Sequence, residues 1–241
     1  MLENQVVVVT GASKGIGRYI SHTFAQAGAK LVLADVDSLD NVVREVKEME
    51  AEVLPVAADV RDESQMAALM DRAASQFGKI DVLVNNAGIV PHFAWGVQRW
   101  PRVRDIEKSF FWDTVLATNL GGTFLGTKHA LRHMEERGSG HIINLYGGGA
   151  GSGAAAYVVS KEAIKVFTRF VAEEERDHNI VVVAISPGGA IATENAPDEA
   201  RARMPGPESS GNRWVLAAQV GIDMSGQLLD LKDGRIVGEA G

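Results

Sequence analysis

The residues of this 241-residue chain best suited to chemistry are Tyr157 and Lys161, which stand four positions apart in the segment YVVSK. The segment continues into a pattern typical of a helix, and residues i and i+4 lie on one helical face. A phenol with its ordinary pKa of about 10 is a weak base near neutral pH, but a neighbouring ammonium favours the phenolate. The pair could therefore exchange a proton with a hydroxyl or carbonyl oxygen. Because most Tyr-x-x-x-Lys pairs are structural, the rest of the sequence must decide.

Three glycines, Gly11, Gly15 and Gly17, follow a strand-like run in VVVVTGASKGIGRYI and open a helical pattern. Gly11 permits a tight turn, Gly15 lets the backbone approach a pyrophosphate, and Gly17 allows close packing of helix on strand. The amino end of the helix then offers free N–H groups and a positive dipole to an anion. Since strand, turn and helix are all predicted here, we expect a dinucleotide-binding loop.

Asp35 ends the second predicted strand, eighteen residues after Gly17. A carboxylate at this position hydrogen-bonds the 2′-hydroxyl of an adenosine ribose and repels a 2′-phosphate. Lys14 and Arg18 could instead receive a 2′-phosphate, but the carboxylate should outweigh them. We therefore predict NAD as the cofactor in preference to NADP, with Asp59 as a further polar candidate at the adenine end.

The elements that would position these groups alternate along the chain. Short apolar runs predict strands at Val6–Val9, Leu31–Ala34, Val53–Ala57, Val82–Val84, Ile142–Leu145, Ile180–Ile185 and Gln227–Leu231. Helical spacing predicts helices at Gly15–Ala27, Asp40–Met49, Glu63–Phe77, Asp113–Glu136 and Ser160–Glu175. Apolar runs without strict alternation are typical of strands covered on both faces. We predict a single α/β domain over residues 1–241, a Rossmann-type, doubly wound parallel sheet of about seven strands with helices on both faces.

Two segments, 89–118 and 187–213, interrupt this regularity, and both follow predicted strands. Ligands of doubly wound sheets bind beyond the carboxyl ends of the strands, so we interpret these segments as substrate loops. The alternative is two solvated surface loops. The first segment is rich in aromatic residues, which could wall a hydrophobic or aromatic substrate, pack a lid or form an oligomer contact. These residues are Phe93, Trp95, Trp100 and Trp112.

Composition excludes several classes of protein. The net charge of −7 argues against a nucleic-acid-binding surface or an anionic-membrane-binding one, because both need clustered cations. The chain has no cysteine, which excludes disulfides, thiol nucleophiles and thiolate metal sites, and we predict no metal centre. We find no signal-peptide pattern and no apolar run of the ~18–20 residues that a membrane span needs. The expected location is cytoplasmic.

Six motifs together resemble one family. They are TGASKGIG (10–17), NNAG (85–88), Asn119 in ATNLGGTFLGTKHAL, YVVSK (157–161), SPGGAIAT (186–193) and SGQLLDLKDG (225–234). Their order and approximate intervals are similar to those of the short-chain dehydrogenase/reductases, over nearly the whole chain. The resemblance implies a nicotinamide-dependent oxidoreductase in which Tyr157 is the acid–base, and a homotetramer or homodimer built through the helices near 113–136 and 158–176.

The same resemblance assigns roles to particular residues. Asn119 would hold a water that relays protons to Lys161, and Lys161 would also bind the nicotinamide ribose. The predicted catalytic residues are Asn119, Tyr157 and Lys161. The predicted cofactor-binding residues are Gly11, Ser13, Lys14, Gly15, Ile16, Gly17, Asp35, Asp59, Val60, Asn86, Ala87, Gly88, Tyr157, Lys161, Pro187, Gly188 and Thr193.

One departure from the family pattern concerns the run of small residues before Tyr157. The family has a substrate-binding serine after the fifth strand, where this chain has Tyr146 and Gly147, and the stretch from there to Tyr157 is shorter than usual. Losing one donor to a developing oxyanion costs about 10²–10³ in rate elsewhere. Ser152 could supply a replacement hydroxyl, whereas strand alternation tends to turn Tyr146 the other way.

Three functions remain open at this point. The first is an NAD-dependent oxidoreductase that interconverts a secondary alcohol and a ketone. The second is an NADPH-dependent reductase of 3-oxoacyl type, suggested by Lys14 and Arg18. The third is a catalytically weakened dinucleotide-binding protein, suggested by Gly147.

Overall fold

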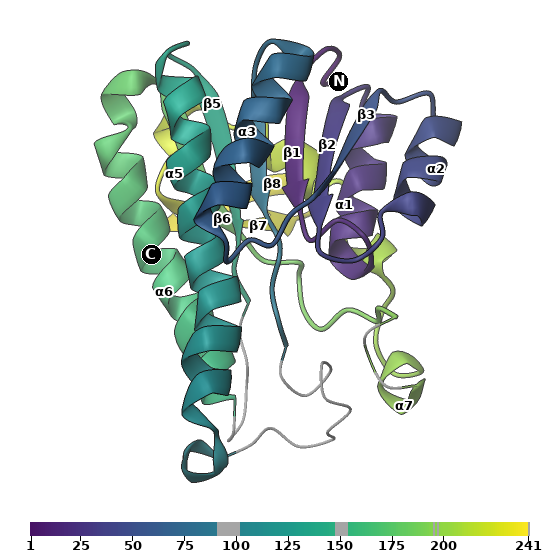
Figure 1. Cartoon of the computed structure of the whole chain (residues 1–241), viewed down its shortest axis with the longest axis vertical. Helices are drawn as coiled ribbons and strands as arrows, with labels where there is room; N and C mark the ends of the chain where they lie inside the picture. The colour runs from purple at the N-terminus through teal and green to yellow at the C-terminus, as the bar shows by residue number, and fades with distance from the viewer. Residues whose placement is uncertain (91–101, 148–153, 195, 197, 241) are drawn as a thin grey trace.

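One eight-stranded sheet with the strand order β3-β2-β1-β4-β5-β6-β7-β8 organises the chain in the computed structural model, which describes residues 1–90, 102–147, 154–194, 196 and 198–240 (Figure 1). The strands are β1 Val6–Thr10, β2 Lys30–Asp35, β3 Val53–Ala57, β4 Val82–Asn85, β5 Gly140–Leu145, β6 Ile180–Ile185, β7 Gln227–Lys232 and β8 Arg235–Ala240. Neighbours are parallel except β7 and β8, which are antiparallel. The predicted Rossmann-type sheet is confirmed.

Helices cover both faces of this sheet. One face carries α1 (Gly15–Gln26), α2 (Asp40–Glu48) and α8 (Arg213–Ala217), and the other carries α3 (Glu63–Phe77), α5 (Gly122–Glu135) and α6 (Ala155–Glu174). The described residues also form the short helix α7 (Asp198–Arg201), the π-helix η2 (Phe110–Gly121) and 3₁₀ turns at Val103–Asp105, Arg176–His178, Pro207–Ser210 and Ile222–Met224. The loop after β6 and α7 lie beyond the carboxyl ends of the strands (Figure 1).

The central strand shows why a continuous apolar run predicts a strand here. Val7 and Val9 of β1 pack into the core under α1 and α2, while Val6 and Val8 pack into the core under α3 and α5. All four valines are fully buried. Successive side chains of a strand point to opposite faces, so a strand covered on both sides needs an apolar residue at every position.

The structure differs from the sequence prediction at several elements, among them the short helices α7 and α8, which were not predicted. It also adds β8, a strand beyond the seven predicted ones. It divides the predicted helix over 113–136 into the π-helix η2 and α5. It begins α6 at Ala155, so Tyr157 lies inside the helix that was predicted from Ser160. Within the described residues, no helix has the length and apolar character needed to cross a membrane.

Candidate active site

The glycine loop after β1 is packed so tightly that only glycine fits at its key positions. Gly11 has φ +67°, and a Cβ there would lie 2.7 Å from the Cα of Ala87. A Cβ on Gly17 would overlap the carbonyl oxygen of Gly11. The Asn86 amide Nδ2 closes the loop by donating to the carbonyls of Thr10 at 2.8 Å and of Gly11 at 3.0 Å. Asn86 of the NNAG motif therefore ties the glycine loop after β1 to the end of β4.

The amino end of α1 has the features of an anion-binding site. Its N-cap residue, Lys14, makes no side-chain capping bond, and its first turn holds no acidic residue, whereas Asp62 caps α3 by accepting from the Gln65 amide. Among the described residues the buried Ser13 Oγ has no hydrogen-bond partner. Unpaired first-turn amides and an orphaned buried hydroxyl suit a phosphate group. The loop therefore fits the pyrophosphate of a dinucleotide.

Asp35 lies at the end of β2 and faces this loop. Its carboxylate accepts hydrogen bonds from the Ser13 amide at 2.9 Å and from the Asp37 amide at 3.1 Å. Both nearby cations carry carboxylate partners. Lys14 Nζ lies 2.7 Å from Asp37, and Arg18 makes a two-pronged pair with Glu45. Backbone amides thus hold the Asp35 carboxylate in place, and carboxylate partners neutralise the charges of Lys14 and Arg18.

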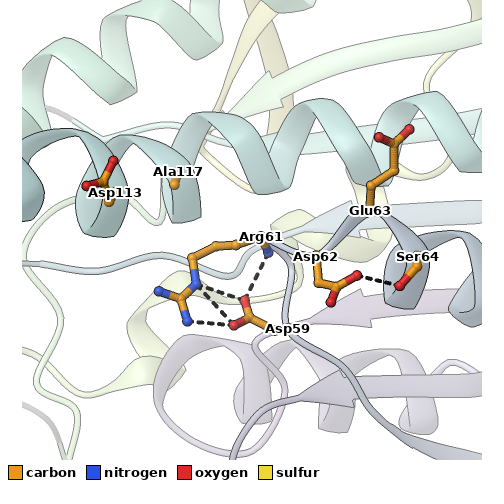
Figure 2. Close-up of a pocket in the computed structure, with 7 residues that line it drawn as sticks. All are labelled: Asp59, Arg61, Asp62, Glu63, Ser64, Asp113 and Ala117. Carbon is orange, nitrogen blue, oxygen red and sulfur yellow. Dashed lines mark hydrogen bonds and ion pairs between the residues drawn. The ribbon is translucent and has the colours of Figure 1, made fainter.

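The expected adenine end opens into a surface cavity of about 610 Å³. Figure 2 shows Arg61 forked onto the Asp59 carboxylate, with Nε 3.0 Å from Oδ1 and Nη2 2.6 Å from Oδ2. The cavity is lined by Asp59, Arg61, Asp62, Glu63, Ser64, Asp113 and Ala117. Val60 is buried beside Gly122, where a Cβ would lie 2.7 Å from the valine Cγ2. Of the two adenine candidates, Asp59 lines this cavity and Val60 does not, and neither Tyr157 nor Lys161 reaches it.

Tyr157 and Lys161 stand on one face of α6, with the ammonium nitrogen 5.8 Å from the centre of the tyrosine ring. Lys161 is buried, and its Nζ donates to the carbonyl of Leu145 at 2.8 Å. Burial lowers the pKa of Lys161 to about 8 and raises the pKa of the Tyr157 phenol above 10.0. We expected the ammonium to lower the phenol pKa; in this structure desolvation dominates instead.

Asn119 is fully buried in η2 and ties three segments together. Its Oδ1 accepts from the Ile89 amide at 2.7 Å, and its Nδ2 donates to the Ile89 carbonyl at 3.2 Å and to the Ser160 Oγ at 3.0 Å. Ser160 in turn donates to the Tyr157 carbonyl at 2.6 Å. Sequence reasoning missed Ser160, although it lies between the two chemical residues in YVVSK. Asn119 therefore fixes the segment after β4 against the start of α6.

Gly147 lies directly in front of the tyrosine. A Cβ at this position would lie 2.8 Å from the phenolic oxygen of Tyr157. Tyr146 packs elsewhere, with Lys165 Nζ 5.1 Å from the centre of its ring. Ser152, the candidate for a replacement hydroxyl, lies outside the described residues. The glycine that stands in the expected serine position is thus brought to the reacting end of the site.

The two candidate substrate loops are described in part. Phe93, Trp95 and Trp100 lie outside the described residues, whereas Trp112 is 55% exposed and packs edge-on against Phe111. In the second loop, Gly188 is exposed with φ +95°, and the Thr193 carbonyl accepts from the Ala196 amide at 2.9 Å. Arg213, which sequence reasoning missed, is buried beside Gly188.

The doubly wound sheet, the glycine loop and the Tyr–Lys pair beyond its strand ends define the class of nicotinamide-dinucleotide oxidoreductases with a Rossmann-type fold. The sequence profile of the short chain dehydrogenase family matches residues 5–203. The chain belongs to this short-chain dehydrogenase/reductase family. It is an NAD(P)-dependent oxidoreductase that acts on the CH–OH or C=O group of a small molecule.

Individual relatives agree with this assignment. The chain is 39% identical over 194 residues to cis-4-hydroxycyclohexanecarboxylate dehydrogenase of Sinomonas cyclohexanicum, covering 77% of this chain and 73% of that protein. It is 33% identical to the 3-oxoacyl-acyl-carrier-protein reductase FabG of Thermotoga maritima, covering 83% and 80%. The crystal structure of a short-chain type dehydrogenase/reductase from Mycobacterium marinum superposes with a TM-score of 0.84 at 29% identity, covering 97% of this chain and 95% of that one.

Proposed function

We propose that this protein interconverts a secondary alcohol and a ketone with NAD, and that Tyr157 exchanges the proton. The observation that carries the proposal is the placement of Tyr157 and a buried Lys161 on one face of α6, at the strand ends that also hold the glycine loop. The bound nicotinamide would accept or give the hydride. The protein itself would bind the cofactor, orient the substrate and move the proton.

The protonation states in this site suit the direction of reduction. Burial raises the Tyr157 pKa, so the phenol is protonated near neutral pH and can give its proton to a carbonyl oxygen. Lys161, with a pKa of about 8, is still mostly an ammonium there. In the direction of oxidation, the ammonium charge favours the phenolate that must take the proton.

The dinucleotide would lie along the strand ends. Asn119 would keep Ile89 and the start of α6 in place beside it. We propose as its binding residues those predicted from the sequence: Gly11, Ser13, Lys14, Gly15, Ile16, Gly17, Asp35, Asp59, Val60, Asn86, Ala87, Gly88, Tyr157, Lys161, Pro187, Gly188 and Thr193. The orphaned Ser13 hydroxyl and the uncapped end of α1 support this placement of the pyrophosphate.

The charges at the adenosine end support NAD in preference to NADP. A 2′-phosphate needs a cation, yet Lys14 is paired with Asp37 and Arg18 with Glu45. The Ser13 amide holds Asp35 at the end of β2, where its charge would repel the 2′-phosphate of NADP. The similarity to a 3-oxoacyl reductase keeps the NADPH-dependent alternative open to test, but the paired cations do not favour it.

The substrate is best sought among cyclic secondary alcohols. The relative from Sinomonas cyclohexanicum is named for a hydroxylated cyclohexane carboxylate. The segments 89–118 and 187–213 would enclose such a ring, and Trp112 would contribute an apolar wall.

We further propose that the protein is a homodimer or homotetramer built through α5 and α6. Large apolar side chains on these helices face solvent: Phe124 is 46% exposed, Val166 46% and Phe170 65%. Phe124 and Phe167 pack edge to face across the two helices, with ring centres 6.4 Å apart. Apolar patches of this kind mark association surfaces.

A panel assay tests the proposed reaction. The purified protein is mixed with NAD⁺ or NADP⁺ and with cyclic secondary alcohols, linear secondary alcohols or a 3-hydroxyacyl thioester, and the near-ultraviolet absorbance of the reduced nicotinamide is followed. We expect turnover with NAD⁺ and a cyclic alcohol. Preference for NADP⁺ and a 3-hydroxyacyl thioester would favour the reductase alternative. Binding of NADH with no turnover of any member would favour the weakened dinucleotide-binding protein.

A further inference from the structure

Arg213, the first residue of α8, is a buried charged residue. It is 5% exposed, and its guanidinium donates from Nε to the Ser210 carbonyl at 2.7 Å and from Nη1 to the Ser186 carbonyl at 2.8 Å. The Asp230 carboxylate lies 3.5 Å from Nη1 and is 46% exposed. Burying a guanidinium is costly unless its donors are satisfied. Here the main acceptors are backbone carbonyls, so the arginine holds backbone in place.

The backbone that it holds is the loop Ser186–Gly189 after β6. Ser186 is bonded directly, and Ser210, itself bonded by Arg213, donates its Oγ to the Pro187 carbonyl at 3.0 Å. At Gly188, where φ is +95°, a Cβ would lie 2.5 Å from Nη2 of Arg213. Only a glycine lets the guanidinium pass this close. Arg213 thus contacts the Ser186 carbonyl and Gly188 directly, and it holds the Pro187 carbonyl only through Ser210.

This loop borders the reacting end of the site. Leu145 and Ile185 are paired in the last register of β5 and β6, and the Tyr146 amide donates to the Ile185 carbonyl at 3.1 Å. The loop that starts at Ser186 therefore lies beside the segment that contains Gly147, and Gly147 faces the Tyr157 hydroxyl. The glycine loop and Asp35, by contrast, lie at the ends of β1 and β2, on the adenosine side.

We propose that Arg213 is a positioning residue that fixes the Ser186–Gly189 loop against the nicotinamide half of the bound dinucleotide. The assignment rests on the proposed function, since it needs a nicotinamide cofactor in this orientation. It makes a selective prediction. Loss of the guanidinium loosens the loop that contacts the nicotinamide and leaves the adenosine half of the site intact.

The test compares two ligands on the full-length protein by calorimetric titration. NADH contains the nicotinamide, whereas ADP-ribose lacks it. We expect Arg213→Met to weaken NADH binding about tenfold or more, because two hydrogen bonds from a charged donor are lost. ADP-ribose binding should stay within about twofold. Arg213→Lys keeps the charge but loses the planar guanidinium, so its NADH affinity should lie between those of Arg213→Met and the wild type.

Control variants separate positioning from general destabilisation. Arg137 donates to the Ile80 carbonyl at 2.9 Å and to Asp81 at 3.0 Å, so Arg137→Met removes similar bonds at the amino end of β4, away from the carboxyl ends of the strands. It should leave both affinities unchanged. If Arg213→Met does not fold, Ser210→Ala removes only the bond to Pro187 and should weaken NADH selectively, by a smaller factor.

Three results would overturn the assignment. They are equal losses of NADH and ADP-ribose affinity in the Arg213 variants, unchanged NADH affinity in all of them, and a wild-type protein that binds neither ligand. The last result would also refute the proposed function, whereas the first two leave it standing.

Discussion

A Cβ atom on Gly147 would lie 2.8 Å from the phenolic oxygen of Tyr157, a separation that real Cβ atoms essentially never show. The glycine is therefore matched in shape to the tyrosine in front of it. Its position, two residues after the end of β5, is the one where the family pattern places a serine. In this protein a serine there would require the tyrosine to move.

Restoring that serine should accordingly harm the enzyme. We expect Gly147→Ser to lower kcat about tenfold or more, because the added Cβ displaces the Tyr157 hydroxyl and a misplacement of about 1 Å can cost about 10²-fold in rate. Gly147→Ala, which adds the same Cβ without a hydroxyl, should lower kcat similarly, and steady-state kinetics of both variants measure this. A serine variant that is faster than wild type, beside a slower alanine variant, would show that the missing hydroxyl limits the reaction.

Asp35→Asn should shift the cofactor preference. The asparagine keeps an oxygen that can accept from the Ser13 amide, which Asp35 bonds at 2.9 Å, but it removes the charge that opposes a 2′-phosphate. We expect the ratio of NADP to NAD affinity to rise about tenfold, or about 1.4 kcal/mol. Titration of both reduced cofactors measures the ratio. Asp37→Asn, which frees Lys14, should also raise the ratio of NADP to NAD affinity. An unchanged ratio in both variants would contradict the proposed recognition of the adenosine ribose.

The glycine loop and the positions of the parallel strands could be predicted from the sequence because local rules govern them. Gly11 has the positive φ that a tight turn needs, and apolar runs mark strands buried on both faces. The antiparallel β8 was missed, yet its signal was present. Asp233 and Gly234, with φ +51° and +73°, are the Asp-Gly pair typical of a type I′ hairpin turn.

Arg213 could not be predicted in the same way. Its backbone partners, Ser210 and Ser186, include one that is 27 positions away in the sequence, and an arginine in a polar segment usually remains solvated. The pKa of Tyr157 was mispredicted for a related reason. The Tyr-x-x-x-Lys spacing reveals the neighbouring ammonium but not the burial that opposes it.

Lys161 should make stability depend on pH in a defined window. Its pKa falls from 10.5 in the unfolded chain to about 8 in the fold. As the pH drops from 10.5 to 8, the unfolded chain gains a proton that the folded chain does not, so the lysine destabilises the fold increasingly until about pH 8 and by a constant amount below it.

The variant Lys161→Met removes this titration. Its free energy of unfolding relative to wild type should be higher near pH 7 than near pH 10.5 by up to about 3 kcal/mol. Urea denaturation at the two pH values gives both differences, and groups common to the two proteins cancel. An equal difference at both pH values would mean that burial does not depress the pKa of this ammonium.

The exposed apolar side chains of α6 should control assembly. We expect the double variant Val166→Glu and Phe170→Glu to convert the oligomer to monomers, because charges buried in an interface are costly without partners. Light scattering after size exclusion gives the mass. Val103→Glu, at a valine that is 71% exposed outside these helices, should leave the mass unchanged. A wild-type protein that is already monomeric would refute the proposed assembly.

The central claim is that Tyr157 moves the proton in an NAD-dependent reaction even though glycine replaces the neighbouring serine. The most direct test measures kcat with NAD⁺ for wild type and Tyr157→Phe on the best alcohol of the panel, together with the NADH affinity of both. We predict a loss of kcat of about 10²–10⁴ with NADH affinity within about twofold. A phenylalanine variant that keeps the wild-type kcat would contradict the account.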